Sequence, residues 1–290
     1  MIRVLVVDDS VLIRKVLCEI FAKASGIEVV GTAEDPFIAR DKIKQLQPDV
    51  ITLDIEMPKM DGITFLKNIM RLKPMPVVMI STLTQKGAPA TLQAMEYGAV
   101  DYVGKPSADQ PELLAEYAQE IIEKVKMASV ANIGRLEQQA NRAPLQVKPA
   151  PRMGKLSNKL IAIGASTGGT EAIRELLSMM PADSPPIVVT QHIPPVFSAS
   201  FAKRLNGIVP MEVHEACDGD KLMAGQVYIA PGDKHLEVIK KGGLLYCRVF
   251  EGERVNLHIP SVEVLFNSVT KNCAKITIGV MLTGMGADGS

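Results

Sequence analysis

Lys159-Leu-Ile-Ala-Ile-Gly-Ala-Ser-Thr-Gly-Gly169 is the stretch that decides the fold of this sequence. It begins as an apolar run typical of a buried strand, passes through a glycine-rich turn and enters a helical pattern at residues 170–180. Glycines permit a turn that larger side chains would block, and this turn holds the Ser166 hydroxyl beside the free N–H groups of the helix start. A strand, a tight turn and a helix in this order predict an α/β fold. The turn alone does not separate a phosphate-binding loop from a site for a reactive serine.

The composition describes a chain of two domains. Its 290 residues exceed the length of one typical domain, and 47% of them are apolar. The 32 basic and 32 acidic residues give a formal net charge of zero, which argues against the broad basic surface that nucleic-acid binding needs. The N-terminus lacks the layout of a signal peptide, and no apolar run reaches the ~20 residues of a membrane span. We expect a soluble, cytoplasmic monomer that neither binds nucleic acid nor inserts into membranes.

The first half alternates short apolar runs with helical patterns. Strands are predicted at residues 2–7, 28–30, 50–53, 77–80 and 101–103, with helices at 11–24, 37–46, 63–72 and 86–97 and a last helix from about residue 111. Five strand–helix units in this order predict a doubly wound, five-stranded parallel sheet with helices on both faces. We assign this domain to residues 1–127, a proline-rich linker to 128–154 and a second domain to 155–290.

Polar side chains follow the strands of the first half at the edge where functional groups gather in such sheets. Asp8 and Asp9 follow the first strand, Asp54 ends the third, Ser81 ends the fourth and Lys105 follows the fifth. Three carboxylates at one edge repel one another unless a hard divalent cation with oxygen ligands compensates them. The pattern therefore predicts a metal site next to a lysine.

These residues resemble the receiver domain of bacterial response regulators. The matching motifs are Val6-Val-Asp-Asp-Ser10, Leu53-Asp-Ile-Glu-Met-Pro-Lys-Met-Asp-Gly62, Ile80-Ser-Thr82 and Asp101-Tyr-Val-Gly-Lys-Pro106. The resemblance implies a flavodoxin-like fold in which Asp54 accepts a phosphoryl group from a chemotaxis histidine kinase. It also implies that Asp9, Asp54 and the main-chain carbonyl of Glu56 ligate Mg²⁺, with Asp8 contributing through water.

Three further residues of this half are expected to respond to the phosphoryl group. Ser81 would hydrogen-bond it, Lys105 would neutralise its charge, and Tyr102 would change rotamer. One added cluster of charge would thus bias a two-state switch.

The second half predicts a mainly parallel sheet with shorter strands and glycine-bearing turns. The expected strands are residues 160–163, 185–192, 211–215, 227–230, 236–239, 244–250 and 276–282, and the expected helices are 170–180, 196–205 and 260–270, the last behind a serine cap. Ser166, His192 and Asp288 each lie at or just past the carboxyl end of a core strand. The other three histidines are predicted to be peripheral because they lie in more polar segments: His214, His235 and His258.

A serine, a histidine and an aspartate at one sheet edge are the parts of a nucleophilic hydrolase. Serine needs a neighbouring base, histidine accepts a proton near neutral pH, and a carboxylate fixes the imidazole tautomer. Gly164, Ser166 and Gly168 also fit the G-x-S-x-G turn of serine hydrolases. The chain order of serine, histidine and aspartate differs from that of the α/β-hydrolases, chymotrypsin and subtilisin, so the turn does not assign the chain to those families.

Four motifs of this half resemble the C-terminal domain of the chemotaxis response-regulator protein-glutamate methylesterases. They are Gly164-Ala-Ser-Thr-Gly-Gly-Thr170, Val189-Thr-Gln-His-Ile-Pro194, Tyr228-Ile-Ala-Pro-Gly232 and Met281-Leu-Thr-Gly-Met-Gly-Ala-Asp-Gly289. With the receiver and the linker, the resemblance covers nearly all of the chain. It implies hydrolysis of glutamate γ-methyl esters on the cytoplasmic helices of chemoreceptors (methyl-accepting chemotaxis proteins), with release of methanol. In some members it also implies deamidation of receptor glutamines.

The resemblance assigns a role to each site residue, with no cofactor for the esterase chemistry. Ser166 would be the nucleophile, His192 the general base and then acid, and Asp288 the orienting carboxylate. Thr167 would help position the imidazole, and the main-chain N–H of Met285 would help bind the oxyanion. The chain stops at Ser290, whereas the family continues, so we expect a C-terminally truncated sequence in which Asp288 lacks supporting structure.

The favoured hypothesis is an esterase that phosphorylation controls: the receiver covers the esterase cleft until a phosphoryl group on Asp54 weakens that docking. The alternative is a non-enzymatic response regulator whose output domain binds a partner or a nucleotide phosphate through the turn at residues 164–169. A DNA-binding output domain is disfavoured by the neutral charge and by the absence of a recognisable helix-turn-helix.

Overall fold

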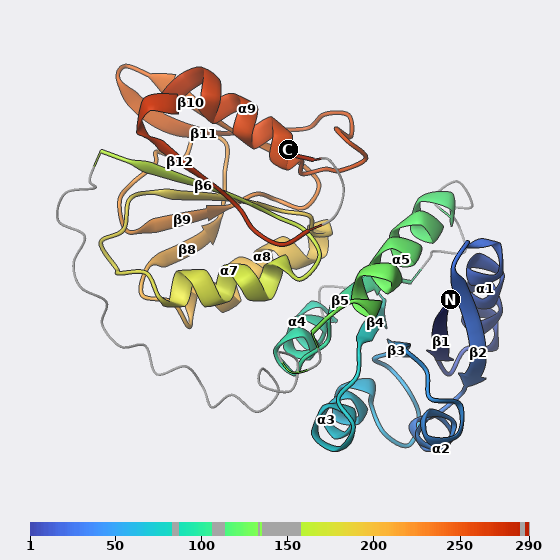
Figure 1. The fold of residues 1–290 in the computed structure, drawn as a ribbon. Helices are drawn as coiled ribbons and strands as arrows, with labels where there is room; N and C mark the ends of the chain where they lie inside the picture. The colour runs from blue at the N-terminus through green and yellow to red at the C-terminus, as the bar shows by residue number, and fades with distance from the viewer. Residues whose placement is uncertain (83–86, 106–113, 133, 135–157, 285–287, 290) are drawn as a thin grey trace. The chain divides into compact units, whose positions relative to one another are not determined.

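The computed structural model describes residues 1–82, 87–105, 114–132, 134, 158–284 and 288–289. The chain divides into two compact units, Met1–Ala143 and Pro144–Ser290, each built around its own five-stranded sheet (Figure 1). Most of the predicted linker lies outside the described residues, so its bounds stay a prediction. None of the described helices is both long enough and apolar enough to cross a membrane.

The sheet of the first unit has the strand order β2-β1-β3-β4-β5, and every pair in it is parallel. Its elements are β1 (Ile2–Val7), α1 (Val11–Lys23), β2 (Ile27–Ala33), α2 (Pro36–Leu46), β3 (Val50–Asp54), α3 (Gly62–Leu72), β4 (Val77–Ser81), α4 (Ala88–Glu96), β5 (Asp101–Gly104) and α5 (Leu114–Ser129). The predicted doubly wound parallel sheet is confirmed. β2 is longer than predicted because its pairing with β1 resumes at Gly31 after a shift in register.

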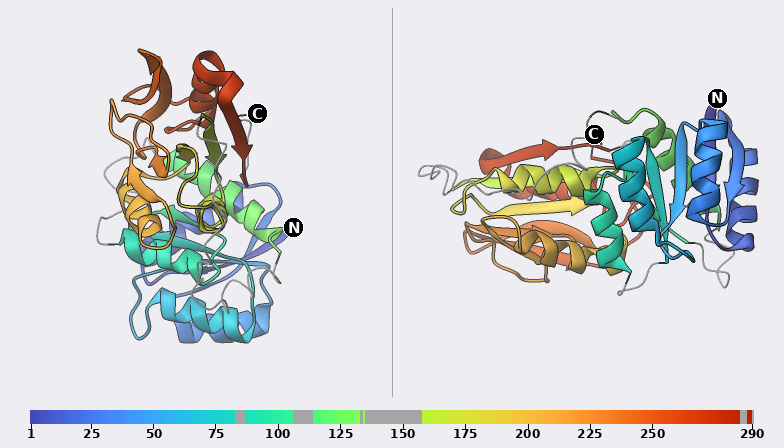
Figure 2. Two further views of the ribbon diagram at one scale, coloured as in Figure 1. Left: turned by 90° about the vertical axis from the view of Figure 1, so that its left-hand side faces the viewer. Right: turned by 90° about the horizontal axis from the view of Figure 1, so that it is seen from below.

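Alternation along the strands divides the core of this unit between two faces. Val4 and Val6 of β1 and Val78 and Ile80 of β4 point to the face that α1 and α5 cover, where they join one buried cluster. α2, α3 and α4 lie on the opposite face (Figures 1 and 2). β3 and β4 are buried along their whole length, which explains why Thr52 is their single polar residue before the carboxyl ends.

The sheet of the second unit has the order β12-β6-β7-β9-β8 and is also parallel throughout. Its elements are β6 (Leu160–Ala165), α7 (Gly169–Ser178), β7 (Ile187–Gln191), α8 (Pro195–Asn206), β8 (Glu212–Glu215), β9 (Gln226–Ile229), β10 (His235–Lys241), β11 (Leu244–Phe250), α9 (Val262–Cys273), the 3-10 turn η2 (Ala274–Ile276) and β12 (Thr277–Met281). β10 and β11 form a separate antiparallel hairpin. The predicted mainly parallel sheet is confirmed.

Helix α9 connects the hairpin to the sheet. Leu265 and Val269 of α9 share a buried cluster with Leu236 of β10 and with Leu160 and Ala162 of β6. α7 and α8 lie on the other face of the sheet (Figure 1). This packing brings the N-terminus of α9 to the carboxyl ends of the central strands.

Candidate active site

The serine lies in a tight turn that packs closely against the segment after β12. Ser166 follows β6, and its N–H donates to the carbonyl of Thr283 at 2.9 Å, which ties the turn to the segment after β12. Gly168 has a φ of 71°, a left-handed conformation that suits glycine. A Cβ on Gly284 would lie 2.7 Å from the Cβ of Ser166, so only a glycine lets that segment approach the serine so closely.

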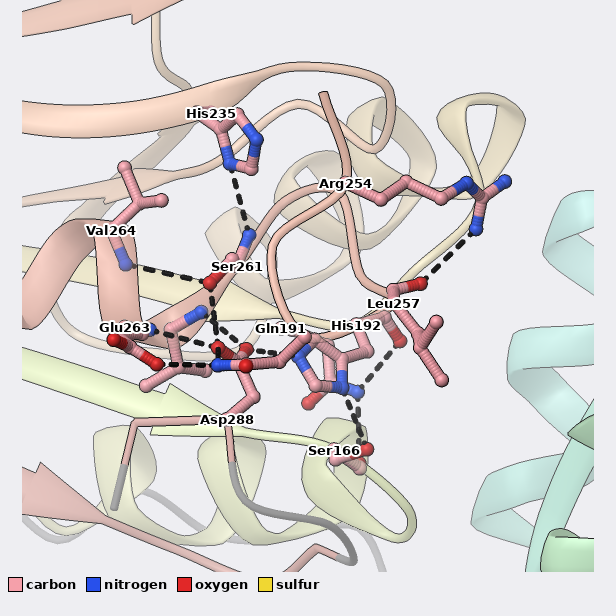
Figure 3. Close-up of polar contacts among 12 residues, drawn as sticks. Ser166, Gln191, His192, His235, Arg254, Leu257, Ser261, Glu263, Val264 and Asp288 are labelled. Carbon is pink, nitrogen blue, oxygen red and sulfur yellow. Dashed lines mark hydrogen bonds and ion pairs between the residues drawn. The ribbon is translucent and has the colours of Figure 1, made fainter. Parts of the chain in front are cut away.

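The histidine is beside the serine because their strands are parallel neighbours in register. Ala165 of β6 pairs with Gln191 of β7, and the next residue of each strand is Ser166 and His192. The Ser166 hydroxyl lies 2.9 Å from His192 Nδ1, and His192 Nε2 lies 2.8 Å from Asp288 Oδ2 (Figure 3). A carboxylate only accepts, so Nε2 carries the proton and Nδ1 is free to accept from the serine. In a chymotrypsin-type triad, Nε2 faces the serine and Nδ1 faces the aspartate, so the two ring nitrogens have exchanged partners here.

Asp288 is bound by the N-terminus of α9. Its Oδ2 accepts from the N–H of Val262 at 2.7 Å, and its Oδ1 accepts from the N–H of Glu263 at 3.1 Å and from the Ser261 hydroxyl at 2.6 Å. Asn256 Nδ2 donates to Oδ1 as well, at 3.2 Å. A helix N-terminus presents unpaired N–H groups and a positive dipole end to an anion.

These donors determine the ionisation of the carboxyl group. Burial by itself would raise the pKa of Asp288, but the hydrogen bonds from His192, Ser261 and the two backbone N–H groups outweigh it and hold this pKa well below the usual range. Asp288 is only 8% exposed. The expectation that this residue lacks supporting structure was therefore wrong, because the support comes from α9 and the loop before it.

Two histidines that were predicted to be peripheral belong to the same site, so that prediction was wrong. His235 is 2% exposed; its Nε2 donates to the Glu253 carbonyl at 2.8 Å, and its Nδ1 accepts from the N–H of Ser261 at 3.3 Å. His258 stacks on the ring of His192, with 3.6 Å between ring centroids and 13° between the planes. Tertiary packing, rather than local polarity, decided their positions.

Gln191 bridges the main chains of Ser166 and His192. Its side chain is 3% exposed, and Nε2 donates to the carbonyl of Ser166 at 2.9 Å and to that of His192 at 3.0 Å. Thr167 is half-buried and forms no hydrogen bond with His192 among the described residues, so its positioning role stays a prediction. Met285 lies outside the described residues, and its oxyanion role also stays a prediction.

The first unit holds an acidic cluster where the strand-end pattern predicted one. Asp8, Asp9 and Asp54 each offer a carboxylate oxygen within 4.8 Å of the others. Lys105 Nζ lies 2.7 Å from Asp54 Oδ2 and 3.1 Å from Asp8 Oδ2. Burial raises the pKa of Asp54 to about 6; the hydrogen bond from Lys105 opposes this rise, and the nearby Asp8 adds to it. Oxygen ligands in this number suit Mg²⁺.

The other predicted residues of the first unit have contacts of their own. Ser81 is buried and accepts a hydrogen bond from the Thr91 hydroxyl at 3.1 Å. The Glu56 N–H lies 3.4 Å from Asp54 Oδ1. Tyr102 is buried, and Lys124 Nζ lies 5.2 Å from the centroid of its ring. Ser81 and Glu56 lie at the carboxyl edge of the first sheet, Tyr102 lies within β5, and their roles stay predictions.

Comparisons with known proteins match both units. The family model of the CheB methylesterase matches residues 161–290, and that of the response regulator receiver domain matches residues 4–138. Protein-glutamate methylesterase/protein-glutamine glutaminase 1 of Xanthomonas euvesicatoria is 52% identical over 295 residues, covering 100% of this chain and 82% of that protein. The enzyme of the same name from Salmonella typhimurium is 51% identical over 289 residues, with the same coverage. This chain belongs to the protein-glutamate methylesterase/protein-glutamine glutaminase family.

Among solved structures, the methylesterase catalytic domain of Thermotoga maritima CheB is 39% identical over 45% of this chain and 70% of that chain, with a TM-score of 0.44. Within this member of the methylesterase/glutaminase family, the family and the α/β fold class were recognised from sequence motifs. The residues that contact His192 or Asp288, or that support Ser261, were not recognised as such: Gln191, His235, Asn256, His258 and Ser261. One signal was present, since the serine cap at Ser261 marks a helix N-terminus, and such a terminus can bind a carboxylate.

Proposed function

We propose that this chain is a serine esterase that hydrolyses glutamate γ-methyl esters on cytoplasmic chemoreceptor helices, and that phosphorylation of its receiver domain regulates it. The observation that carries the proposal is the hydrogen-bonded series from Ser166 through His192 to the helix-bound Asp288. Family membership supports the substrate class and the place of action in the cytoplasm. Glutamine side chains of the same receptors are a second substrate class, which the double names of the relatives support.

The geometry defines how the residues would act on an ester. Ser166 Oγ attacks the carbonyl carbon while its proton passes to His192 Nδ1, and the Nε2 proton stays on the hydrogen bond to Asp288. The tetrahedral intermediate then expels methoxide, which takes the proton from Nδ1 and leaves as methanol. Water repeats the sequence on the acyl-enzyme and gives the glutamate carboxylate and free Ser166. With a glutamine substrate the leaving group is ammonia.

The low pKa of Asp288 explains how the charge is kept where the reaction needs it. His192 becomes positively charged when it accepts the serine proton, and an ionised Asp288 stabilises that charge. Because the donors from α9 are already in place, they need not reorganise as the charge develops. The carboxylate thus remains an anion throughout the cycle.

The receiver unit would supply the control. Asp54 is the proposed phosphoryl acceptor from a histidine kinase, and Asp8, Asp9, Asp54 and the carbonyl of Glu56 would hold Mg²⁺. When bound, the ion supplies positive charge that offsets the carboxylates and the incoming phosphate. Lys105 supplies a second positive charge at 2.7 Å from Asp54.

Substitution of the nucleophile tests the esterase proposal against the alternative of a phosphate-binding output domain. Ser166→Ala should lower methanol release from methylated receptor by about 10⁴–10⁶-fold, because serine and its base act as one unit. Ser178→Ala is the matched control, since this serine of α7 bonds only the Arg174 carbonyl at 2.6 Å among the described contacts. Retained turnover in Ser166→Ala would exclude the proposed mechanism.

A further inference from the structure

We propose that His258 is a positioning residue for His192, and that it acts through the stacked faces of the two imidazoles. The inference rests on the proposed esterase function and deepens it. Both ring nitrogens of His192 are engaged at the ring edge, Nδ1 by Ser166 and Nε2 by Asp288. His258 covers a face of the same ring, at 3.6 Å between centroids and 13° between planes. His258 therefore restrains a motion of the His192 ring that the two hydrogen bonds at the ring edge restrain only weakly.

That motion is a tilt of the ring about the line between its two hydrogen bonds. Nδ1 and Nε2 flank the same ring carbon, Cε1, and hydrogen bonds to them oppose displacement within the ring plane more strongly than a tilt out of it. A second ring parallel to the first opposes this tilt through close packing. The lone pair of Nδ1 then stays directed at the serine hydroxyl.

A tight turn aims His258 at this face. Val255 and His258 exchange two backbone hydrogen bonds, of 3.0 and 2.9 Å, around Asn256 and Leu257. These central residues have φ values of 50° and 70°, the left-handed pair that defines a type I′ turn. A leucine is disfavoured in that conformation, and it is 74% exposed, so core packing does not explain its place.

The same short segment also contacts the carboxylate. Asn256 donates to Asp288 Oδ1, and Ser261, three residues after His258, donates to the same oxygen. Residues 255–261 thus touch the base on its face and the orienting carboxylate on its far oxygen (Figure 3 shows Ser261, Asp288 and His192). A single segment sets the geometry of the pair, with His258 as the part that contacts the base.

The stack is expected to matter more in the transition state than before it. His192 becomes an imidazolium only while it holds the serine proton, and an aromatic face packed against such a cation can stabilise it. An interaction that strengthens only when charge develops raises kcat and leaves KM unchanged. Loss of the stack should therefore appear in kcat.

The test compares His258→Leu, which keeps bulk but removes the ring, with His258→Phe, which restores an aromatic face. Methanol release from methylated receptor should show a kcat about three- to thirtyfold lower in His258→Leu at an unchanged KM, and most of the loss should be recovered in His258→Phe. His214→Leu is the matched control, because that half-buried histidine packs edge-on against Tyr228 in another part of the unit. Its kcat should equal that of the native chain.

A second measurement does not depend on the receptor substrate. Diisopropyl fluorophosphate reacts with an activated serine: the Oγ–P bond forms, the P–F bond breaks, fluoride leaves and the proton passes to His192. The rate of labelling at Ser166 should fall in His258→Leu and recover in His258→Phe. Labelling of the native chain without methanol release would reject the proposed substrate while still testing His258.

Four results would overturn the inference. Equal rates of methanol release and of Ser166 labelling in His258→Leu and the native chain would show that the stack does not contribute to the reaction. An equal loss of kcat in the leucine and phenylalanine variants would assign His258 a role other than stacking, provided that urea unfolding shows both variants to be folded. A rise in KM alone would make it a substrate contact. A native chain that is not labelled at Ser166 would also reject it, since the serine would then not be activated through His192.

Discussion

Asp54 and Asp288 are buried carboxylates in opposite electrostatic situations. Asp288 meets four donors from α9 and its preceding loop in addition to His192, so its negative charge is stabilised. Among the described residues, Asp54 meets one full positive charge, Lys105, and lies beside a second buried carboxylate, Asp8, so its charge is poorly compensated there. The donors around Asp288 keep its carboxylate ionised. The carboxylate of Asp54 would be stabilised by a bound cation, which would offset its negative charge.

Replacement of Asp54 by asparagine should therefore stabilise the receiver unit at neutral pH. The pKa of Asp54 in the native state is about 6, above its ordinary value of 3.8, so between these values the native state holds a proton that the unfolded chain has released. Stability then falls as the pH rises through this window. Asp54→Asn removes the penalty and should add about 1–3 kcal/mol to the free energy of unfolding at pH 7.5, and nothing below about pH 4.

Urea unfolding at the two pH values checks this prediction, with EDTA present to remove divalent ions. Asp41→Asn is the control, because in the described part of the chain this exposed carboxylate pairs with its neighbour Arg40 alone, and its loss should change the free energy of unfolding by less than about 0.5 kcal/mol. An Asp54→Asn chain no more stable than the native one at pH 7.5 would mean that Lys105 fully compensates the carboxylate.

At the scale of elements, the site depends on how closely α9 approaches β6. A Cβ on Gly164 would lie 2.2 Å from Cγ1 of Val262, the residue whose N–H binds Asp288. Gly164 belongs to the turn motif noticed in the sequence, and the structure adds a second reason for a glycine there. The turn itself uses the left-handed Gly168, whereas Gly164 makes room for the helix that carries the carboxylate.

Gly164→Ala should thus damage the fold and the site together. The added methyl group must displace Val262, which should cost about 1–3 kcal/mol of stability and move a donor of Asp288. Val262→Ala in the same chain removes the clashing Cγ atoms and should restore part of both losses, a coupling that a double-mutant cycle measures. Urea unfolding and the rate of Ser166 labelling provide the two readouts.

The control for this cycle is Gly279→Ala on the neighbouring strand β12, where a new Cβ meets nothing within 4 Å. It should leave the labelling rate unchanged. Purely additive effects of Gly164→Ala and Val262→Ala would argue that α9 does not depend on contact with Gly164.

The elements were predictable from the sequence because their signals are local. Apolar runs and helical spacing gave the order of strands and helices, and parallel topology placed Ser166 and His192 at one edge. The contacts of Asp288 were not predictable, since they join segments 25 to 32 residues apart through the packing of α9 against the β10–β11 hairpin. His258 was missed for the same reason: its sequence neighbours are polar, and only the turn at Asn256 and Leu257 directs it to His192.

At the scale of the whole molecule, the two units carry separate chemistry. We propose phosphoryl chemistry for the cluster around Asp54 and ester chemistry for Ser166 and its partners, and under this proposal the glycine-rich turn at residues 164–169 need not bind phosphate. Each sheet presents its site at the carboxyl ends of its strands, as expected for open parallel sheets. A regulated enzyme needs, in addition, a free-energy coupling between the two sites.

That coupling predicts a response of the esterase to a phosphodonor. Acetyl phosphate with Mg²⁺ should raise methanol release by the whole chain about five- to 150-fold, the usual range for coupled sites. Asp54→Asn should abolish the response but keep the basal rate, because Asp54 takes no part in ester hydrolysis. An equal rise in the rate of methanol release by Asp54→Asn would trace the effect to another group. No rise in the native chain would show that the two units are not coupled. Phosphorylation changes the charge at Asp54 alone, so only a conformational equilibrium shared by both units can carry its effect to Ser166.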